Sequence, residues 1–223
     1  MSELITFIHN NQALLWNLTL QHLTLVSISL LLAIFIGVSV GILINRYQIL
    51  AQPILQIANT IMTIPSIALF GLMLPILGII DQGLGELPAL IALTVYSVPP
   101  IMRNTYTAIE QVEQALVDAA RGIGLNTWQI LYEVQLPLAL PVIISGVQIA
   151  AVMNIGIAAI AVYIGAGGLG VLIQKGISET YLTMLLAGAV LVSLLAVIVE
   201  ITMLFLSKLS ISKGIRLQQQ VRN

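Results

Sequence analysis

Residues 134–174 read VQLPLALPVIISGVQIAAVMNIGIAAIAVYIGAGGLGVLIQ, and none of these residues is Lys, Arg, Asp or Glu. Two further stretches, 4–45 and 47–80, are also free of charged residues. A helix needs about 20 apolar residues to cross a bilayer, so each stretch can hold at least one crossing. Backbone groups in lipid must be hydrogen-bonded within the protein, and these stretches lack the polar alternation of a β-barrel strand. We therefore expect an all-α polytopic membrane protein.

The composition agrees with that expectation. Of the 223 residues, 59% are hydrophobic and 8% are charged, whereas soluble domains carry about 25% charged residues. Hydropathy and the positions of Pro and Gly predict five transmembrane helices in one domain, 1–223. We place them at 23–44, 54–79, 87–102, 141–164 and 183–207. The chain has no cysteine, which excludes disulfides and thiolate metal sites.

The basic residues predict the orientation. If five spans are threaded in order, Lys175 falls on one side of the membrane. The other side receives Arg46, Arg103, Arg121, Lys208, Lys213, Arg216 and Arg222. Because basic loops tend to remain in the cytoplasm, the N-terminus is expected outside and the C-terminus inside.

Several features inside the spans are candidates for helix contacts or for a solute path. Gly37 and Gly41 predict either a close contact between two helices or, because glycine is common in membrane helices, no specific contact. Pro65 and Pro75 interrupt the second span, and the carbonyl groups that they free are tolerated where they are buried in protein or line a wet cavity. This pattern is typical of a path-lining helix or of a static kink. The path candidates are Pro65, Ser66, Tyr96, Ser97 and Asn154.

Two of the polar residues in the spans have a structural and a functional interpretation. Asn154 either hydrogen-bonds to a neighbouring helix or touches a solute, because an unpaired amide at this depth is costly. Glu200 is the only acidic residue within a predicted span. It either pairs with a neighbour or takes part in transport.

The glycine-rich stretch IGAGGLG at 164–170 matches the dinucleotide-binding pattern only by chance, because no strand–helix–strand unit surrounds it. We expect a flexible outer turn there, or a hinge for a re-entrant segment at 171–181. No catalytic motif, metal-ligand set or phosphate-binding loop is found in the sequence. We therefore expect no cofactor and no enzymatic activity, with energy supplied by another protein or by an ion gradient.

A polar segment at about 106–140 separates the third and fourth predicted spans. Its centre, residues 118–137, reads DAARGIGLNTWQILYEVQLP. Asp118 suits the first turn of a short helix, which Gly122 and Gly124 interrupt. Asn126 or Thr127 can cap a second short helix from Trp128 that ends at Pro137. Such a helix–turn–helix predicts a docking element.

The spacing D-A-A-x3-G-x9-V-x-L-P resembles the loop E-A-A-x3-G-x9-I-x-L-P of type I, binding-protein-dependent ABC-importer permeases. The matching residues are Asp118, Ala119, Ala120, Gly124, Val134, Leu136 and Pro137. The stretches 64–69 (IPSIAL), 103–106 (RNTY), 136–141 (LPLALP) and 164–170 look most like permeases for quaternary-amine osmoprotectants: glycine betaine, choline and carnitine. Methionine-type permeases are the next most similar.

The resemblance implies a multi-pass subunit of the bacterial inner membrane, in contact with lipid and not with nucleic acid. Its implied partners are two cytoplasmic ABC ATPase subunits, a second permease subunit, identical or paralogous, and an extracytoplasmic substrate-binding protein. The implied ATPase-coupling residues are Asp118, Ala119, Ala120, Gly124, Leu136 and Pro137.

Aromatic residues make up only 5% of the chain, with Tyr96 and Tyr163 isolated. Because quaternary amines are usually held by aromatic cages, selectivity is expected mainly in the binding protein. A methionine permease, an ion-gradient-driven secondary transporter and a passive channel or scaffold subunit remain as alternatives. A secondary transporter would be expected to show midplane charges and internal repeats.

Overall fold

The computed structural model describes residues 2–210, and the described residues are helical without a strand. In chain order the first elements are α1 (Ser2–Asn10), α2 (Gln12–Arg46), α3 (Gln48–Thr63), α4 (Ser66–Gly78) and α5 (Glu86–Glu110). They are followed by α6 (Gln114–Gly122), α7 (Thr127–Gln129), the π-helical η1 (Ile130–Gln135) and α8 (Leu136–Ala158). The chain continues through the 3-10 helix η2 (Ile160–Ile164), α9 (Gly170–Ser178) and α10 (Leu182–Ser210). The all-α prediction is confirmed.

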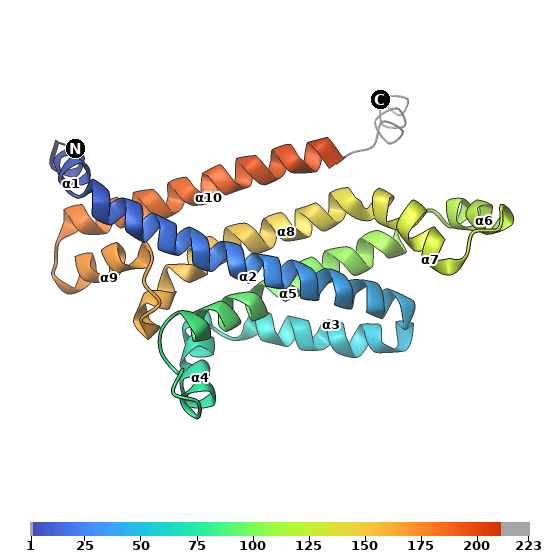
Figure 1. The fold of residues 1–223 in the computed structure, drawn as a ribbon, viewed down its shortest axis with the longest axis horizontal. Helices are drawn as coiled ribbons and strands as arrows, with labels where there is room; N and C mark the ends of the chain where they lie inside the picture. The colour runs from blue at the N-terminus through green and yellow to red at the C-terminus, as the bar shows by residue number, and fades with distance from the viewer. Residues whose placement is uncertain (1, 211–223) are drawn as a thin grey trace.

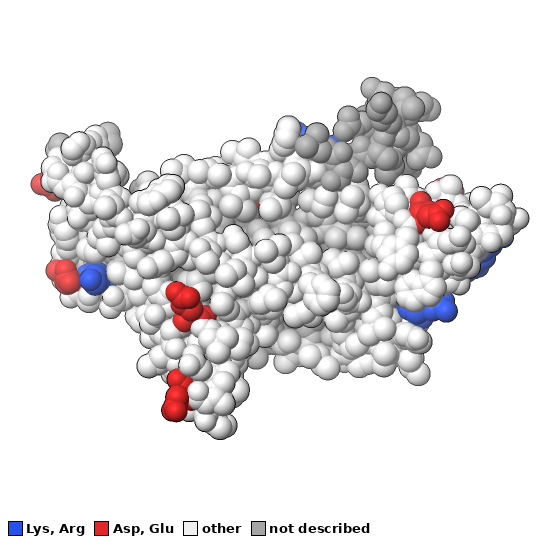
Figure 2. Space-filling view, in the orientation of Figure 1, with Lys and Arg blue, Asp and Glu red and all other residues white. Residues whose placement is uncertain are grey.

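The long helices run roughly along one axis of the molecule (Figure 1). Helix α5 packs between α2 and α8, α10 packs on α8 and α9, and α3 packs on α5 and α2. Helices α6 and α7 lie at one end of the long axis, and α1 and α9 lie at the other (Figure 1). Charged side chains on the face shown in Figure 2 lie mostly towards these two ends and near α4, and the middle is almost free of them. This arrangement suits a protein whose middle faces lipid.

Three described helices are long and apolar enough to cross a membrane: Gln12–Arg46, Thr127–Ala158 and Leu182–Lys208. The pair α3 and α4 makes a fourth if it is taken as one broken span. The total of five spans therefore stays a prediction. The orientation also stays a prediction, since Lys213, Arg216 and Arg222 lie outside the described residues.

The second predicted span, 54–79, is wrong as a single helix. Helix α3 ends at Thr63, and α4 leaves it at an angle of 101°. The physical reason is Pro65, which lacks an N–H and forces the preceding residue away from the helical conformation. Ile64 accordingly is extended, with φ −70° and ψ 126°.

The third and fourth predicted spans also differ from the helices observed. The third, 87–102, is too short, because α5 continues to Glu110 through Pro99 and Pro100. The fourth predicted span, 141–164, starts and ends too late. Helix α8 begins at Leu136 and ends at Ala158, and the 3-10 helix η2 follows it. Hydropathy detects only the apolar part of a helix. It therefore does not show where a polar end continues the same helix.

The predicted glycine contact is confirmed. A Cβ atom on Gly41 would lie 2.7 Å from Cβ of Thr105 and 2.9 Å from the carbonyl oxygen of Met102. A Cβ atom on Gly37 would lie 2.9 Å from Cβ of Ile101. The backbones of α2 and α5 therefore approach so closely that a side chain larger than hydrogen does not fit without a shift.

Candidate coupling segment and solute path

The polar segment begins with α6, whose end explains the spacing of the Ala-Ala-x3-Gly motif. The N–H of Leu125 donates to the carbonyl of Ala120 at 3.1 Å, and the N–H of Gly124 donates to the carbonyl of Arg121 at 2.9 Å. This pair of bonds is a Schellman motif, in which the residue after the C-cap must adopt a positive φ. Gly124 has φ +90°. Its role here is conformational, because a Cβ atom at this position would meet nothing within 4 Å.

The second helix is capped by Asn126, one of the two predicted capping residues. Its side chain accepts hydrogen bonds from the backbone N–H groups of Trp128 and Gln129, both at 3.0 Å. The side chain of Gln129 in turn accepts from the N–H of Asn126 at 2.8 Å. This reciprocal arrangement is a capping box, and it fixes the direction in which the second helix leaves the turn.

The prediction that this second helix ends at Pro137 is wrong. The chain from Thr127 to Ala158 forms one continuous helix that includes η1 and α8. Pro137 cannot donate a backbone hydrogen bond. The π-helical η1 lies directly before it, with the wider i→i+5 pattern in which the N–H of Leu136 donates to the carbonyl of Leu131. A π-helical turn therefore takes the place of the predicted break.

A small core holds the segment together and joins it to the membrane helices. Val117 and Ala120 of α6 and Ile130 of η1 are buried against one another, with Leu125 packed beside them. One turn further, Leu136 packs on a second cluster that includes Leu131, Ala139, Ala108 and Ile109. Because Ala108 and Ile109 belong to α5, the segment is attached to the transmembrane bundle through both α5 and α8.

The outer surface of the segment carries exposed apolar side chains. Ile123 is 80% exposed, Trp128 63% and Tyr132 60%. The rings of Trp128 and Tyr132 are stacked with centroids 6.1 Å apart. Sequence reasoning missed Ile123 and Tyr132, although the spacing of Trp128 and Tyr132 by four residues signals a shared helix face.

The motif residues divide between surface and core. Asp118 and Ala119 are exposed on α6, whereas Ala120 is buried. The carboxylate of Asp118 accepts from Gln114 at 3.0 Å and lies 3.5 Å from the guanidinium of Arg121. Both charged side chains are well exposed, so this ion pair contributes little to stability. Their charges remain accessible to a docking partner.

Among the path candidates, the structure brings Pro65, Ser66 and Tyr96 together. The hydroxyl of Tyr96 on α5 donates to the carbonyl of Ile64, the residue before Pro65. A carbonyl freed by the break between α3 and α4 is therefore satisfied by a side chain from the neighbouring helix. Ser66 begins α4 directly after the break.

Ser97 and Asn154 lie elsewhere, inside the helix packing. Asn154 of α8 is fully buried, and its amide donates to the hydroxyl of Ser29 on α2 at 3.0 Å. This bond is the structural one of the two interpretations given for Asn154. Ser97 is also fully buried, and its hydroxyl has no hydrogen-bond partner within the described part of the chain. Both residues are therefore enclosed by the helices around them.

Glu200 is held by Gln148 of the neighbouring helix. The amide of Gln148 on α8 donates to the Glu200 carboxylate on α10 at 2.7 Å. The bond links two helices inside the predicted membrane region, where an isolated carboxylate would be costly.

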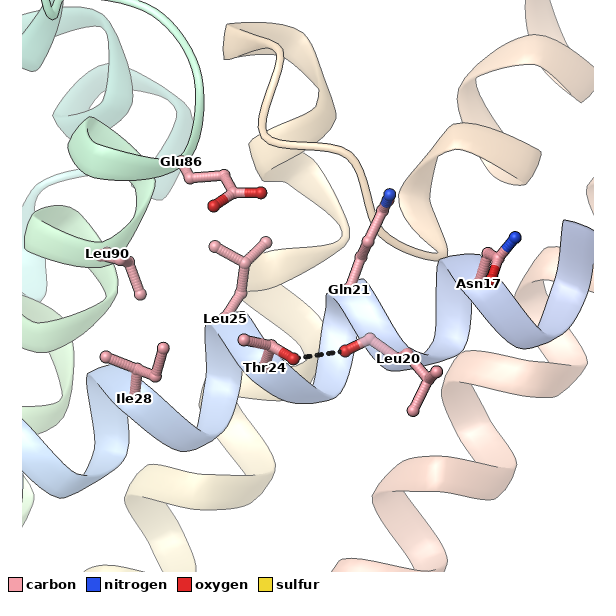
Figure 3. A pocket seen from close by; sticks show the side chains of 8 residues that line it. All are labelled: Asn17, Leu20, Gln21, Thr24, Leu25, Ile28, Glu86 and Leu90. Carbon is pink, nitrogen blue, oxygen red and sulfur yellow. Dashed lines mark hydrogen bonds between the residues drawn. The ribbon is translucent and has the colours of Figure 1, made fainter.

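The end of the molecule opposite the polar segment contains the glycine turn and a surface hollow. Gly165, Gly167 and Gly168 all have positive φ, and the N–H of Gly168 donates to the side chain of Gln21 at 3.2 Å. The turn leads into α9, a short helix where the re-entrant segment was expected. A hollow of about 370 Å³ lies beside it, between the first half of α2 and the start of α5. Figure 3 shows Glu86 extending from α5 towards Gln21 and Leu25 of α2.

Comparisons with known proteins agree on the kind of molecule. Residues 16–211 match the family described as "Binding-protein-dependent transport system inner membrane component". The osmoprotectant import permease protein OsmW of Salmonella typhimurium is 48% identical over 214 residues, which cover 96% of this chain and 100% of that protein. The glycine betaine/carnitine/choline transport system permease protein OpuCB of Bacillus subtilis is 34% identical, covering 99% of this chain and 100% of that protein. A solved structure of the MetNI methionine ABC transporter in an inward-facing conformation superposes with a TM-score of 0.80 and 26% identity, covering 90% of this chain and 98% of that one.

Proposed function

We propose, from the premise that the chain belongs to the family of binding-protein-dependent transport system inner membrane components, that it is the permease of an ATP-driven importer for small osmoprotectants. Glycine betaine, choline and carnitine are the solutes that we propose. The observation that carries this function is the full-length identity of 48% to an osmoprotectant import permease. The methionine alternative has weaker support, since the MetNI chain that shares the fold is 26% identical.

The permease itself is not the enzyme in this proposal. ATP is hydrolysed by separate cytoplasmic ATPase subunits, and an extracytoplasmic binding protein delivers the solute to a pair of permease subunits, identical or paralogous. The setting is the bacterial cytoplasmic membrane, which the chain crosses several times. The family description, an inner membrane component of a binding-protein-dependent system, supports the membrane setting and the binding protein, and the similarity to an ABC transporter supports the ATP-driven system.

The segment at about 106–140, within a single domain of residues 1–223, is the proposed site of ATPase coupling. Asp118, Ala119, Ala120 and Gly124 shape its first helix and turn, and Leu136 and Pro137 lie where it enters α8. The exposed side chains of Ile123, Trp128 and Tyr132 support this proposal, because exposed aromatic residues on a folded projection are typical of interaction surfaces. The packing of the segment against α5 and α8 offers a route by which its movement reaches the bundle.

Selectivity is proposed to reside mainly in the binding protein. Within residues 2–210 the aromatic contacts are the pairs Phe7–Tyr181 and Trp128–Tyr132, and a cage for a quaternary amine needs more than two rings around one point. Tyr96 is buried and already bonded to the Ile64 carbonyl. The permease then offers a path that tolerates several related solutes.

The test is uptake and ATP hydrolysis by the complex reconstituted in liposomes with its binding protein. Glycine betaine, choline or carnitine should stimulate hydrolysis and enter the liposomes only with ATP, and L-methionine should do neither. The same liposomes without the binding protein are the control. Stimulation by methionine alone would favour the amino-acid alternative, and uptake without the ATPase would contradict an ATP-driven importer.

A further inference from the structure

Helix α3 carries a polar face that the bundle does not cover. We call this face the polar stripe; its members are Gln52, Gln56, Asn59, Thr60 and Thr63, and all are exposed. At 100° per residue they occupy an arc of about 100° on the helix. The residues that α3 buries in the bundle, Ala51 and Ala58, lie on a different face. A third face, with Leu50 and Ile57, is apolar and exposed.

Helix α3, which carries the stripe, runs from the side of the molecule with α6 and α7 towards α4 and the break before Pro65 (Figure 1). Thr63 lies 15 residues after Gln48, which corresponds to about 22 Å along a helix. The side chains of Gln52 and Gln56 are both exposed. Exposed amides are costly in hydrocarbon and in a dry interface alike, so we expect water beside these side chains.

Arg103 of α5 faces the same side. Its guanidinium donates to the side chain of Asn59, and Arg103 is itself exposed. Asn59 lies about 16 Å along α3 from Gln48. A guanidinium has five N–H donors and keeps its charge at this depth. Because α5 continues past Arg103 to Glu110, we place this charge inside the membrane region and not beyond its cytoplasmic edge. A lipid-facing guanidinium there would be strongly unfavourable, which again indicates a wet cavity.

We propose that the polar stripe and Arg103 line a water-filled inner half of the solute path, open to the cytoplasm and ending at the break before Pro65. We assign to Arg103 the contact with the carboxylate of a zwitterionic osmolyte, because a guanidinium binds carboxylates in a directed, charge-assisted way. This inference rests on the proposed function and on the predicted orientation. It replaces the buried Ser97 and Asn154 as the residues nearest to the solute.

The absence of cysteine from the natural chain makes the cavity testable. Gln52→Cys, Gln56→Cys and Thr63→Cys are introduced singly into the full complex in inside-out vesicles. The matched control is Ile57→Cys, on the same helix and 62% exposed. Because thiolates form in water and not in lipid, a membrane-impermeant thiol reagent should label the stripe at least tenfold faster than position 57.

Equal or slower labelling of the stripe would overturn the cavity. A disulfide between the two permeases at Gln56→Cys, with little labelling, would show a dry subunit interface and would overturn it as well. Labelling does not depend on transport, so it separates this inference from the proposed function. If the wild-type complex moves no osmolyte but the stripe is labelled, the function is wrong and the cavity stands.

The charge of Arg103 has its own readout. The quantity to measure is the ratio of the labelling rate with an anionic thiol reagent to the rate with a cationic one. This ratio should be at least threefold higher in Gln56→Cys than in the double variant Gln56→Cys with Arg103→Gln. In transport, Arg103→Gln should reduce uptake of glycine betaine more than uptake of choline, which has no carboxylate, and Arg103→Lys should restore part of the difference. An unchanged reagent preference, or equal loss for both solutes, would overturn the carboxylate contact.

Discussion

Replacing Gly124 by Ala tests the coupling turn directly. Gly124 closes the Schellman motif with φ +90°, a conformation that costs a residue with a Cβ atom about 1–2 kcal/mol. No atom lies within 4 Å of the position that a Cβ would take, so steric overlap adds nothing to this cost. The expected loss corresponds to a roughly 5- to 30-fold smaller population of the native turn.

Gly122 provides the matched control only two residues away. A Cβ atom there also meets nothing within 4 Å. Gly122 is the last residue of α6, and its φ is not positive. Alanine is favoured over glycine in a helix by up to about 1 kcal/mol. Gly122→Ala is therefore expected to be neutral or slightly stabilising. Gly124→Asn is expected to fall between wild type and Gly124→Ala, because Asn enters the left-handed region more readily.

The assay compares ATP-driven uptake, solute-stimulated hydrolysis and recovery of the ATPase with the permease in reconstituted complexes. Gly124→Ala should lower uptake and ATPase recovery while the amount of permease in the membrane stays unchanged. Wild-type uptake in Gly124→Ala would refute the conformational role of this glycine. Equal damage from Gly122→Ala would show that the segment needs small residues for space, contrary to the geometry.

Three further changes have defined outcomes. Gly41→Ala should destabilise the bundle by about 1–3 kcal/mol in a denaturant titration, because its Cβ would lie 2.9 Å from the carbonyl oxygen of Met102 and the two helices would have to separate; an unchanged midpoint would contradict the close contact. Asn126→Ala should cost about 1 kcal/mol through loss of the cap and should speed proteolysis of the coupling segment, whereas Asn126→Ser should preserve much of the protection. Glu200→Gln should retain assembly and most of the uptake, since its amide oxygen still accepts from Gln148; complete loss of transport with normal assembly would give this carboxylate a role in transport.

Local chemistry made much of the coupling segment predictable. Asn126 was one of two candidate capping residues, with Thr127, because side-chain oxygens of these types accept from the free N–H groups of a helix start. Gly124 was one of two predicted helix interruptions, and of the pair only Gly124 has a positive φ. Both depend on residues within one turn of each other, and the sequence displays such neighbours directly.

Longer-range geometry was less predictable. Pro65 indicated a break, but neither its angle of 101° nor the bond from Tyr96 of α5 to the Ile64 carbonyl was predictable. Pro137 indicated a helix end, yet the helix continues through it, with the π-helical η1 directly before α8. For Asn154 the sequence left open a bond to a neighbouring helix or contact with a solute; the structure shows the bond, and its partner Ser29 lies 125 residues away. These outcomes depend on which helices become neighbours, and hydropathy carries no such information.

The uninterrupted helix from Thr127 to Ala158 has a mechanical consequence. Its 32 residues span about 48 Å at 1.5 Å per residue, with the π-helical η1 and Pro141 along its length. If it moves as one body, a tilt of about 5° about one end displaces the other end by about 4 Å on this length. A displacement at Trp128 would then reach the end that carries Asn154, whose amide donates to Ser29 of α2.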